Sequence, residues 1–115
     1  MSLAKLLEER FKVRTRAVRN PKAVTAASTT AQLILNNNPD RLGLVIMNLG
    51  AQVCYVDLDN EVSGVDGSEI GIRLDANGGS WGCVWDEDFD MTAWAWWIIS
   101  VTGTPRVFCL EIVEY

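Results

Sequence analysis

The feature that most constrains the fold is a succession of short apolar segments, each ended within a few residues by asparagine, glycine or proline. Segments 31–36, 42–48 and 53–58 are separated by two such clusters, Asn36–Asp40 and Asn48–Gly50. These residues favour turns because they adopt, or are fixed in, backbone conformations that other residues avoid. The pattern therefore predicts strands joined by turns, with no alternation of strands and long helices.

The same pattern continues to the C-terminus, where further strands are expected at 70–74, 81–85, 94–101 and 106–113. Short connections predict two hairpins, one joining 42–48 to 53–58 and the other joining 94–101 to 106–113. A chain of 115 residues is long enough for one domain of this kind. We expect an all-β domain over residues 23–115, an antiparallel, jelly-roll-like β-sandwich of about eight strands.

Residues 1–22 differ from the rest and predict a separate N-terminal helix and arm. Ser2 is expected to cap a helix over residues 2–12 that is too short to be stable alone in water. Residues 13–22 alternate in polarity and predict an extended arm that ends at Asn20-Pro21. The helix carries an apolar stripe, which requires a surface to cover: Leu3, Leu6, Leu7 and Phe11.

Charge is divided unevenly between the arm and the body. Residues 1–22 hold seven basic and two acidic residues, whereas residues 23–115 hold three basic and thirteen acidic ones. An acidic body repels a phosphate backbone, so nucleic acid is not the expected partner of the basic arm. We expect the apolar stripe and four arginines to bind a partner protein instead: Arg10, Arg14, Arg16 and Arg19.

The acidic loop of the body allows three interpretations. It contains four carboxylates in five residues: Asp86, Glu87, Asp88 and Asp90. They are expected to be solvated, but they could receive the basic arm of a neighbouring copy or bind calcium, as could Asp57, Asp59 and Glu61. No metal is expected to be required, because the EF-hand spacing fails at Val62, where its glycine would stand.

The residue types that most catalytic sites need are missing. The chain contains no histidine, which excludes Ser-His-Asp, Cys-His and histidine–metal sites. Three widely spaced cysteines, Cys54, Cys83 and Cys109, predict buried free thiols and no disulfide framework. No apolar run reaches the ~20 residues that span a bilayer, and no signal peptide is evident. We expect no enzyme, no cofactor, no membrane contact, and folding in a cytoplasm.

Tryptophan is the main candidate for intermolecular contact. Five tryptophans exceed what one core of this size requires, and segment 94–99 is apolar at alternating positions of both parities. A sandwich strand normally has one polar face, so a partner should cover the second face. We expect a subunit interface built from Trp94, Trp96, Trp97 and Ile99, with glycan binding by exposed tryptophans as the alternative.

Several motifs in residues 23–115 resemble the small β-sandwich virion proteins of tailed bacteriophages. In that group an N-P-x-R motif opens a strand that ends in N-x-G, as Asn38-Pro39-x-Arg41 and Asn48-x-Gly50 do here. A G-I-x-L motif precedes a Gly-Ser turn, matched by Gly71-Ile72-x-Leu74 and then Gly79-Ser80. The closing strand contains Val107-Phe108-x-Leu110-Glu111. Segments 1–22, 86–90 and 94–97 depart from the pattern.

The resemblance implies a structural role in a virion assembled in the host cytoplasm. Such proteins decorate or cement capsids, or serve as head fibres or tail adaptors. It implies the major capsid protein or another virion protein as partner, and a homo-oligomer, with a trimer favoured because decoration proteins sit where three or more capsid subunits meet. A glycan-binding module, a tail or fibre adaptor and, less favoured, a small barrel enzyme are the alternatives.

Overall fold

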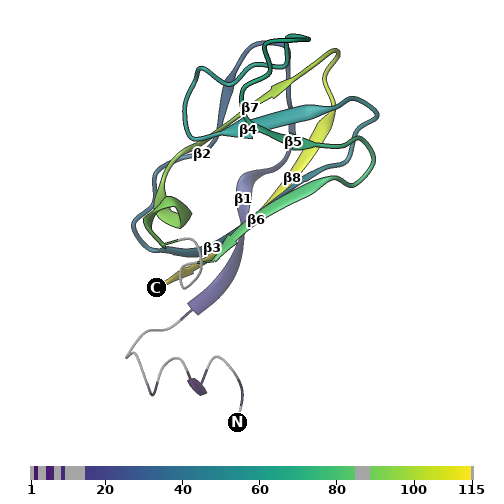
Figure 1. Ribbon diagram of the computed structural model, residues 1–115. Coiled ribbons are helices and arrows are strands. Elements are labelled where there is room, and N and C mark those ends of the chain that lie inside the picture. The colour runs from purple at the N-terminus through teal and green to yellow at the C-terminus, as the bar shows by residue number, and fades with distance from the viewer. Residues whose placement is uncertain (1, 3–4, 7–8, 10–14, 85–88, 115) are drawn as a thin grey trace.

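The computed structural model (Figure 1) describes residues 2, 5–6, 9, 15–84 and 89–114, with the backbone alone described for residues 15–26 and 89. Its strands form two four-stranded sheets in which all pairings are antiparallel. Sheet A has the order β1-β8-β3-β6, from β1 (Thr15–Ala26), β8 (Arg106–Glu114), β3 (Arg41–Asn48) and β6 (Ser80–Val84). Sheet B has the order β2-β7-β4-β5, from β2 (Gln32–Leu35), β7 (Trp96–Ser100), β4 (Cys54–Asp57) and β5 (Ile72–Leu74).

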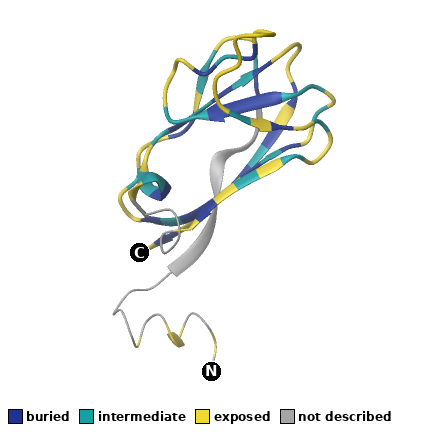
Figure 2. Cartoon of the chain, viewed as in Figure 1, coloured by how far each residue is buried: buried dark blue, intermediate teal, exposed yellow. Residues whose placement is uncertain are grey.

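The hydrophobic core lies between the two sheets. Alternate residues of β3 and β8, such as Leu44, Ile46, Val107 and Cys109, belong to the same buried cluster as residues of β4 and β7. Successive side chains of a strand point to opposite faces of its sheet, so each strand contributes every second residue to this core. Buried segments accordingly line the interior of the molecule in Figure 2. The predicted all-β antiparallel architecture is confirmed.

Both predicted hairpins are wrong. β3 pairs with β6 and β8 in sheet A, whereas β4 belongs to sheet B; likewise β7 belongs to sheet B and β8 to sheet A. Connections 49–53 and 101–105 therefore cross between the sheets. They lie side by side, since Val101 N donates to Val53 O at 3.0 Å, and a Cβ on Gly50 would collide with Pro105. The glycine at position 50 is needed for this close approach.

The N-terminal segment joins the body earlier than the sequence predicted. β1 begins at Thr15 and pairs with β8, from Thr15 opposite Glu114 to Ala26 opposite Arg106. Residues 15–22 are extended, as expected, but they form part of sheet A and not a separate arm. The pairing register shifts between Arg19 and Val24, around Asn20-Pro21, because proline has no N–H for the ladder.

The helix predicted over residues 2–12 is not supported. Most of its residues, including Leu3, Leu7 and Phe11, lie outside the described residues. Of the described residues, Lys5, Leu6 and Glu9 are helical, Leu6 N donates to Ser2 O at 3.0 Å, and Lys5 N donates to Ser2 Oγ at 3.2 Å, which is the contact expected of Ser2 as the N-cap. Elsewhere the chain forms a short 3-10 helix, η1 (Phe89–Ala93), that the sequence analysis missed. None of the described helical segments is long and apolar enough to cross a membrane.

Candidate functional site

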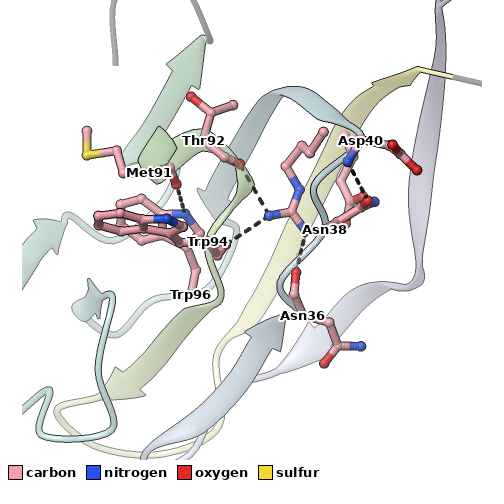
Figure 3. Close-up of polar contacts among 9 residues, drawn as sticks. Asn36, Asn38, Asp40, Met91, Thr92, Trp94 and Trp96 are labelled. Carbon is pink, nitrogen blue, oxygen red and sulfur yellow. Dashed lines mark hydrogen bonds and ion pairs between the residues drawn. The ribbon is translucent and has the colours of Figure 1, made fainter. Parts of the chain in front are cut away.

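The start of β3 carries a buried arginine that organises one end of the sandwich. Arg41 Nη1 donates to the carbonyl oxygens of Thr92 and Trp94, at 3.3 and 3.0 Å. Its Nη2 donates to Asn36 O at 2.7 Å and forms an ion pair with Glu111 Oε1 at 3.3 Å (Figure 3). The arginine side chain is 1 % exposed. It thus ties η1, the end of β2 and β8 together, and we call these residues the Arg41 cluster.

The Arg41 cluster fixes an exposed tryptophan at its edge. Trp94 follows η1 and is 48 % exposed, although its carbonyl is held by the buried guanidinium. The neighbouring turn is closed by Asn38, whose Oδ1 accepts from Asp40 N at 3.0 Å and whose N–H donates to Ala93 O at 2.8 Å. An exposed aromatic ring on a rigid corner is typical of interface anchors, because little side-chain and backbone freedom is lost on binding.

Strand β7 presents two apolar faces, as the sequence indicated. Trp96 and Ile98 point into the core at 1 % and 0 % exposure, and Trp96 stacks at an angle on Trp81 with ring centroids 6.2 Å apart. Trp97 and Ile99 point outward and are half-buried. Trp96 must therefore be removed from the predicted interface, because its ring fills the space between the sheets and its Nε1 donates to Met91 O at 3.3 Å.

The outer face of sheet B is open around Trp97 and covered around Ile99. Leu33 and Asp57 lie directly opposite Trp97 on the two neighbouring strands, and Leu33 is 46 % exposed. Directly opposed residues of antiparallel strands share a face, so Leu33 and Trp97 form one apolar surface. Tyr55, opposite Ile99, is buried beneath the connection 58–71, where Gly64 lies against its ring. We call Leu33 and Trp97 on this face, together with Trp94 on the corner that leads into β7, the tryptophan surface.

A hollow of about 390 Å³ lies beside the covered part of sheet B. Its lining includes Tyr55, Asp66, Glu69 and Arg73. Arg73 Nε donates to Asp75 Oδ1 at 2.7 Å, and this hydrogen bond raises the pKa of Arg73. Both partners are exposed, so the ion pair contributes little to stability. The lining contains no cysteine, and without histidine in the chain it has no imidazole base.

The three cysteines are buried, and Cys54 and Cys109 are free thiols, as predicted. Burial raises the pKa of Cys54 to about 11. Burial, reinforced by the charge of Glu111, raises the pKa of Cys109 to about 12, although Arg41 opposes this shift. A thiol with so high a pKa stays protonated at neutral pH and is a poor nucleophile and metal ligand.

Most of the predicted arm contacts cannot be placed. Leu3, Leu7, Arg10, Phe11 and Arg14 lie outside the described residues, and so do Asp86, Glu87 and Asp88. Leu6 is 39 % exposed and Asp90, in η1, is exposed. Arg16 and Arg19 are placed by backbone register alone, opposite Val113 and Leu110 of β8.

The second acidic segment, considered for calcium, is described in full. Asp57 Oδ1 accepts from Leu58 N at 2.7 Å, and Asp59 Oδ1 accepts from Glu61 N at 3.1 Å. Asp59 thus closes a local turn of the backbone, and Asp57 binds the amide of the next residue. Among the residues that the structure describes, no group of three or more acidic or cysteine side chains could hold a metal ion.

Sequence reasoning missed two residues of this site. Arg41 was seen only as part of the N-P-x-R motif, yet its position at the start of a buried strand places it in the interior. Leu33 was not singled out, although it alternates with Gln32 and Ile34 in a strand of mixed polarity. Leu33 becomes part of the site only through the pairing of β2 with β7, and the sequence does not reveal that pairing.

Comparisons with known proteins do not identify the chain. No family model and no curated protein matches it. Among solved structures, it is similar to a chain from Bacillus endospore appendages, a family of disulfide-linked pili, with 18% identity over 89% of this chain and 87% of that one and a TM-score of 0.49. A dTDP-4-dehydrorhamnose 3,5-epimerase from Elizabethkingia anophelis NUHP1 has 16% identity over 99% of this chain and 59% of its own, with a TM-score of 0.42. At these values neither similarity bears on function.

Proposed function

We propose that this chain is a non-enzymatic structural subunit that decorates or cements a bacteriophage capsid as part of an oligomer. The observation that carries the proposal is the tryptophan surface, on which Trp94 and Leu33 are 48 % and 46 % exposed. Exposed tryptophan on a rigid body is enriched where proteins bind each other. The motifs that resemble virion proteins supply the capsid as the partner, and a trimer is the favoured oligomer.

The buried chemistry of the chain supports a structural role over catalysis. The sequence contains no histidine, and both thiols with raised pKa lie in the core. The guanidinium of Arg41 already binds three carbonyl oxygens and Glu111, so it is not available to a substrate. The contacts of Arg41 hold this corner of the molecule in place, as a structural role requires.

A glycan-binding module is the second candidate, and the exposure of Trp94 favours it. An indole face can stack on the apolar face of a sugar ring as well as on a protein. This function predicts that soluble oligosaccharides of the host surface quench or shift tryptophan fluorescence in a saturable way. Trp94→Ala should abolish that change.

The proposal is tested by binding purified protein to particles that lack it, from the phage that carries the gene. We expect the wild-type chain to co-sediment with particles in a saturable amount, and Trp97→Asp to reduce the affinity roughly tenfold or more, since it buries an unpaired charge. Leu49→Asp is the matched control, because Leu49 is 44 % exposed on the 49–53 connection, away from the tryptophan surface. Absence of saturable binding by the wild type would contradict the proposal.

A further inference from the structure

The hollow beside sheet B is walled by a short hairpin within the connection 58–71. Ser63 and Ile70 pair as an antiparallel bridge, in which Ser63 N donates to Ile70 O at 3.0 Å and Ile70 N donates to Ser63 O at 2.9 Å. At the tip of the hairpin, Gly67 N donates to Glu69 Oε1 at 3.2 Å. The wall is held by its own hydrogen bonds, so the hollow is formed before any ligand arrives, as is usual for small-molecule sites.

The floor of the hollow is apolar. Val53 directly precedes β4 and Val101 directly follows β7, and Val101 N donates to Val53 O at 3.0 Å. The hairpin lies close over this floor at Gly64, where a Cβ would be 3.2 Å from Val101 Cγ2 and 3.5 Å from Tyr55 Cδ2. Val101 is nevertheless 43 % exposed. Apolar surface is therefore open to a ligand between the hairpin and the strands.

The rim of the hollow holds polar groups of both signs. Asp66 and Glu69 come from the hairpin, and Arg73 comes from β5. Arg73 Nε donates to Asp75 Oδ1 at 2.7 Å, and the pKa of Arg73 is raised first by Asp75 and then by a hydrogen bond with Tyr55. A phenol oxygen that accepts such a bond keeps its own proton to donate. The rim thus offers carboxylate acceptors, guanidinium donors and a hydroxyl group together.

This mixture of groups favours an uncharged ligand. A cation in the hollow would meet Arg73, and an anion would meet Asp66 and Glu69, so either would bring like charges together. A hydroxyl group both donates and accepts hydrogen bonds, so it can bind a carboxylate or a guanidinium. We propose that the hollow binds a neutral sugar ring, with its hydroxyl groups on the rim and its apolar C–H face on the floor.

A zwitterion such as a free amino acid fits the rim less well. Its carboxylate needs a cation, but Arg73 is already paired with Asp75, and its ammonium group needs a carboxylate, but one oxygen of Glu69 is held by the amide of Gly67. A sugar hydroxyl leaves these pairs in place, because it uses the donors and acceptors that remain.

The size of the hollow fits a single sugar ring. Its volume of about 390 Å³ is at the lower end of the ~300–1,000 Å³ range of small-molecule sites. Arg73 is 60 % exposed, so its hydrogen bonds to a ligand compete with water. A small ligand with contacts of this kind is expected to bind with a Kd in the millimolar range.

The sugar site is separate from the tryptophan surface. Val101 follows Trp97 by four residues, or roughly 13 Å along the strand direction. The site therefore differs from the second candidate function, in which the ring of Trp94 holds the glycan. Sugar binding in the hollow does not rest on the proposed function, and it is measured without particles.

The test is a titration of the full chain with methyl glycosides of glucose, galactose, mannose and N-acetylglucosamine, followed by the NMR shifts of the backbone amides. We expect at least one glycoside to give saturable shifts in 63–70 and 101–103. Raising the salt concentration from about 0.05 to about 0.5 M should change its affinity less than about twofold, because the ligand carries no charge. Shifts confined to 94–97, or no saturable shift with any glycoside up to about 100 mM, would overturn the proposal.

Charged probes test the choice of ligand class. Glycine, 1,4-diaminobutane and inorganic phosphate represent a zwitterion, a cation and an anion. We expect each of them to bind in the hollow more weakly than the best glycoside. Tighter binding of any one of them at the same amides would assign the hollow to a charged ligand and overturn the proposal.

A substitution in the rim tests the role of the guanidinium. Arg73→Gln removes its donors and should weaken glycoside binding about fivefold or more. The fold should be unaffected because the ion pair of Arg73 with Asp75 is exposed, and a thermal melt checks this. Arg106→Gln is the matched control, an exposed arginine at the start of β8 in sheet A, and should bind like the wild type. Equal affinity of a folded Arg73→Gln variant and the wild type would overturn the proposed site.

Discussion

Both ends of β3 bury a polar side chain, but the two side chains are stabilised in different ways. Each places a polar side chain in the interior: Arg41 at the start and Asn48 at the end, at 2 % and 0 % exposure. Asn48 is a neutral amide whose Nδ2 donates to Gln52 O and Leu74 O, at 2.6 and 3.3 Å, while its Oδ1 accepts from Gly50 N at 3.0 Å. The Asn48 end thus uses one amide to close turns.

The Arg41 end uses a charge paired with Glu111, and the hydrogen bonds of this end are not all satisfied. Its guanidinium has four partners, but Arg41 Nε and the buried Thr92 Oγ1 have no hydrogen-bond partner among the described residues. Burying a charge in this way costs stability that an apolar packing would not. In return the cluster rigidly holds the corner that carries Trp94. Under the proposed function, the Asn48 end serves the fold alone, whereas the Arg41 end also positions Trp94 for binding.

The largest expected loss of stability comes from a substitution at the Arg41 end of β3. Arg41→Met leaves Glu111, whose side chain is 13 % exposed, without its partner and strips three carbonyl oxygens of their donor. Loss of one member of a buried ion pair costs about 3–5 kcal/mol of the free energy of unfolding, measured by urea denaturation. The double variant Arg41→Met with Glu111→Leu should recover part of that loss. A loss below about 1 kcal/mol would mean that the pair is solvated.

A smaller effect is expected at the other end. Asn48→Ala removes two donated hydrogen bonds and one accepted one, and should cost about 2–3 kcal/mol in the same urea experiment. It should leave particle binding of the folded protein unchanged. An Asn48→Ala variant that is folded but fails to bind would contradict the functional division between the ends.

The two ends of β3 can also be compared at alkaline pH, because a buried thiol lies near each of them. Cys54 lies opposite Leu74, whose carbonyl Asn48 holds, whereas Cys109 is influenced by Glu111 and Arg41. Unfolded thiols lose their protons near pH 9, but the folded pKa values are about 11 and about 12. The stability due to the protonated thiols is therefore present below pH 9 and falls as pH rises toward 11 and 12. Thermal melts should show this decline, and Cys54→Ala should reduce it; a flat profile from pH 9 to 11 would contradict the burial.

The sequence predicted the positions of the strands better than the pairing between them. Apolar periodicity located β2 to β8 because it depends on each strand separately, whereas the sheet to which a strand belongs depends on its connections. Asn48-Leu49-Gly50 resembles a hairpin turn, but here Gly50 packs against Pro105 and the chain crosses to sheet B. A hairpin turn and a connection that crosses between the sheets use the same turn residues. Only the packing of the two connections distinguishes one from the other.

Apolar outward faces were predictable where alternating positions of both parities in a strand are apolar. Residues 96–99 showed that pattern, and Trp97 was correctly placed on the outward face. The same pattern in 107–112 matches the apolar outward positions of β8. Leu33 and Arg41 could not be predicted, because their roles arise from pairing between segments distant in the sequence.

Hydrogen–deuterium exchange of the protein, free and bound to its particles, tests the division of the molecule most directly. We predict that binding slows exchange in 32–35 and 94–97, around the tryptophan surface. Exchange in 49–53 and 101–105, at the Asn48 end, should not change. Protection confined to the Asn48 end, or absent from both ends when binding is saturated, would contradict the account.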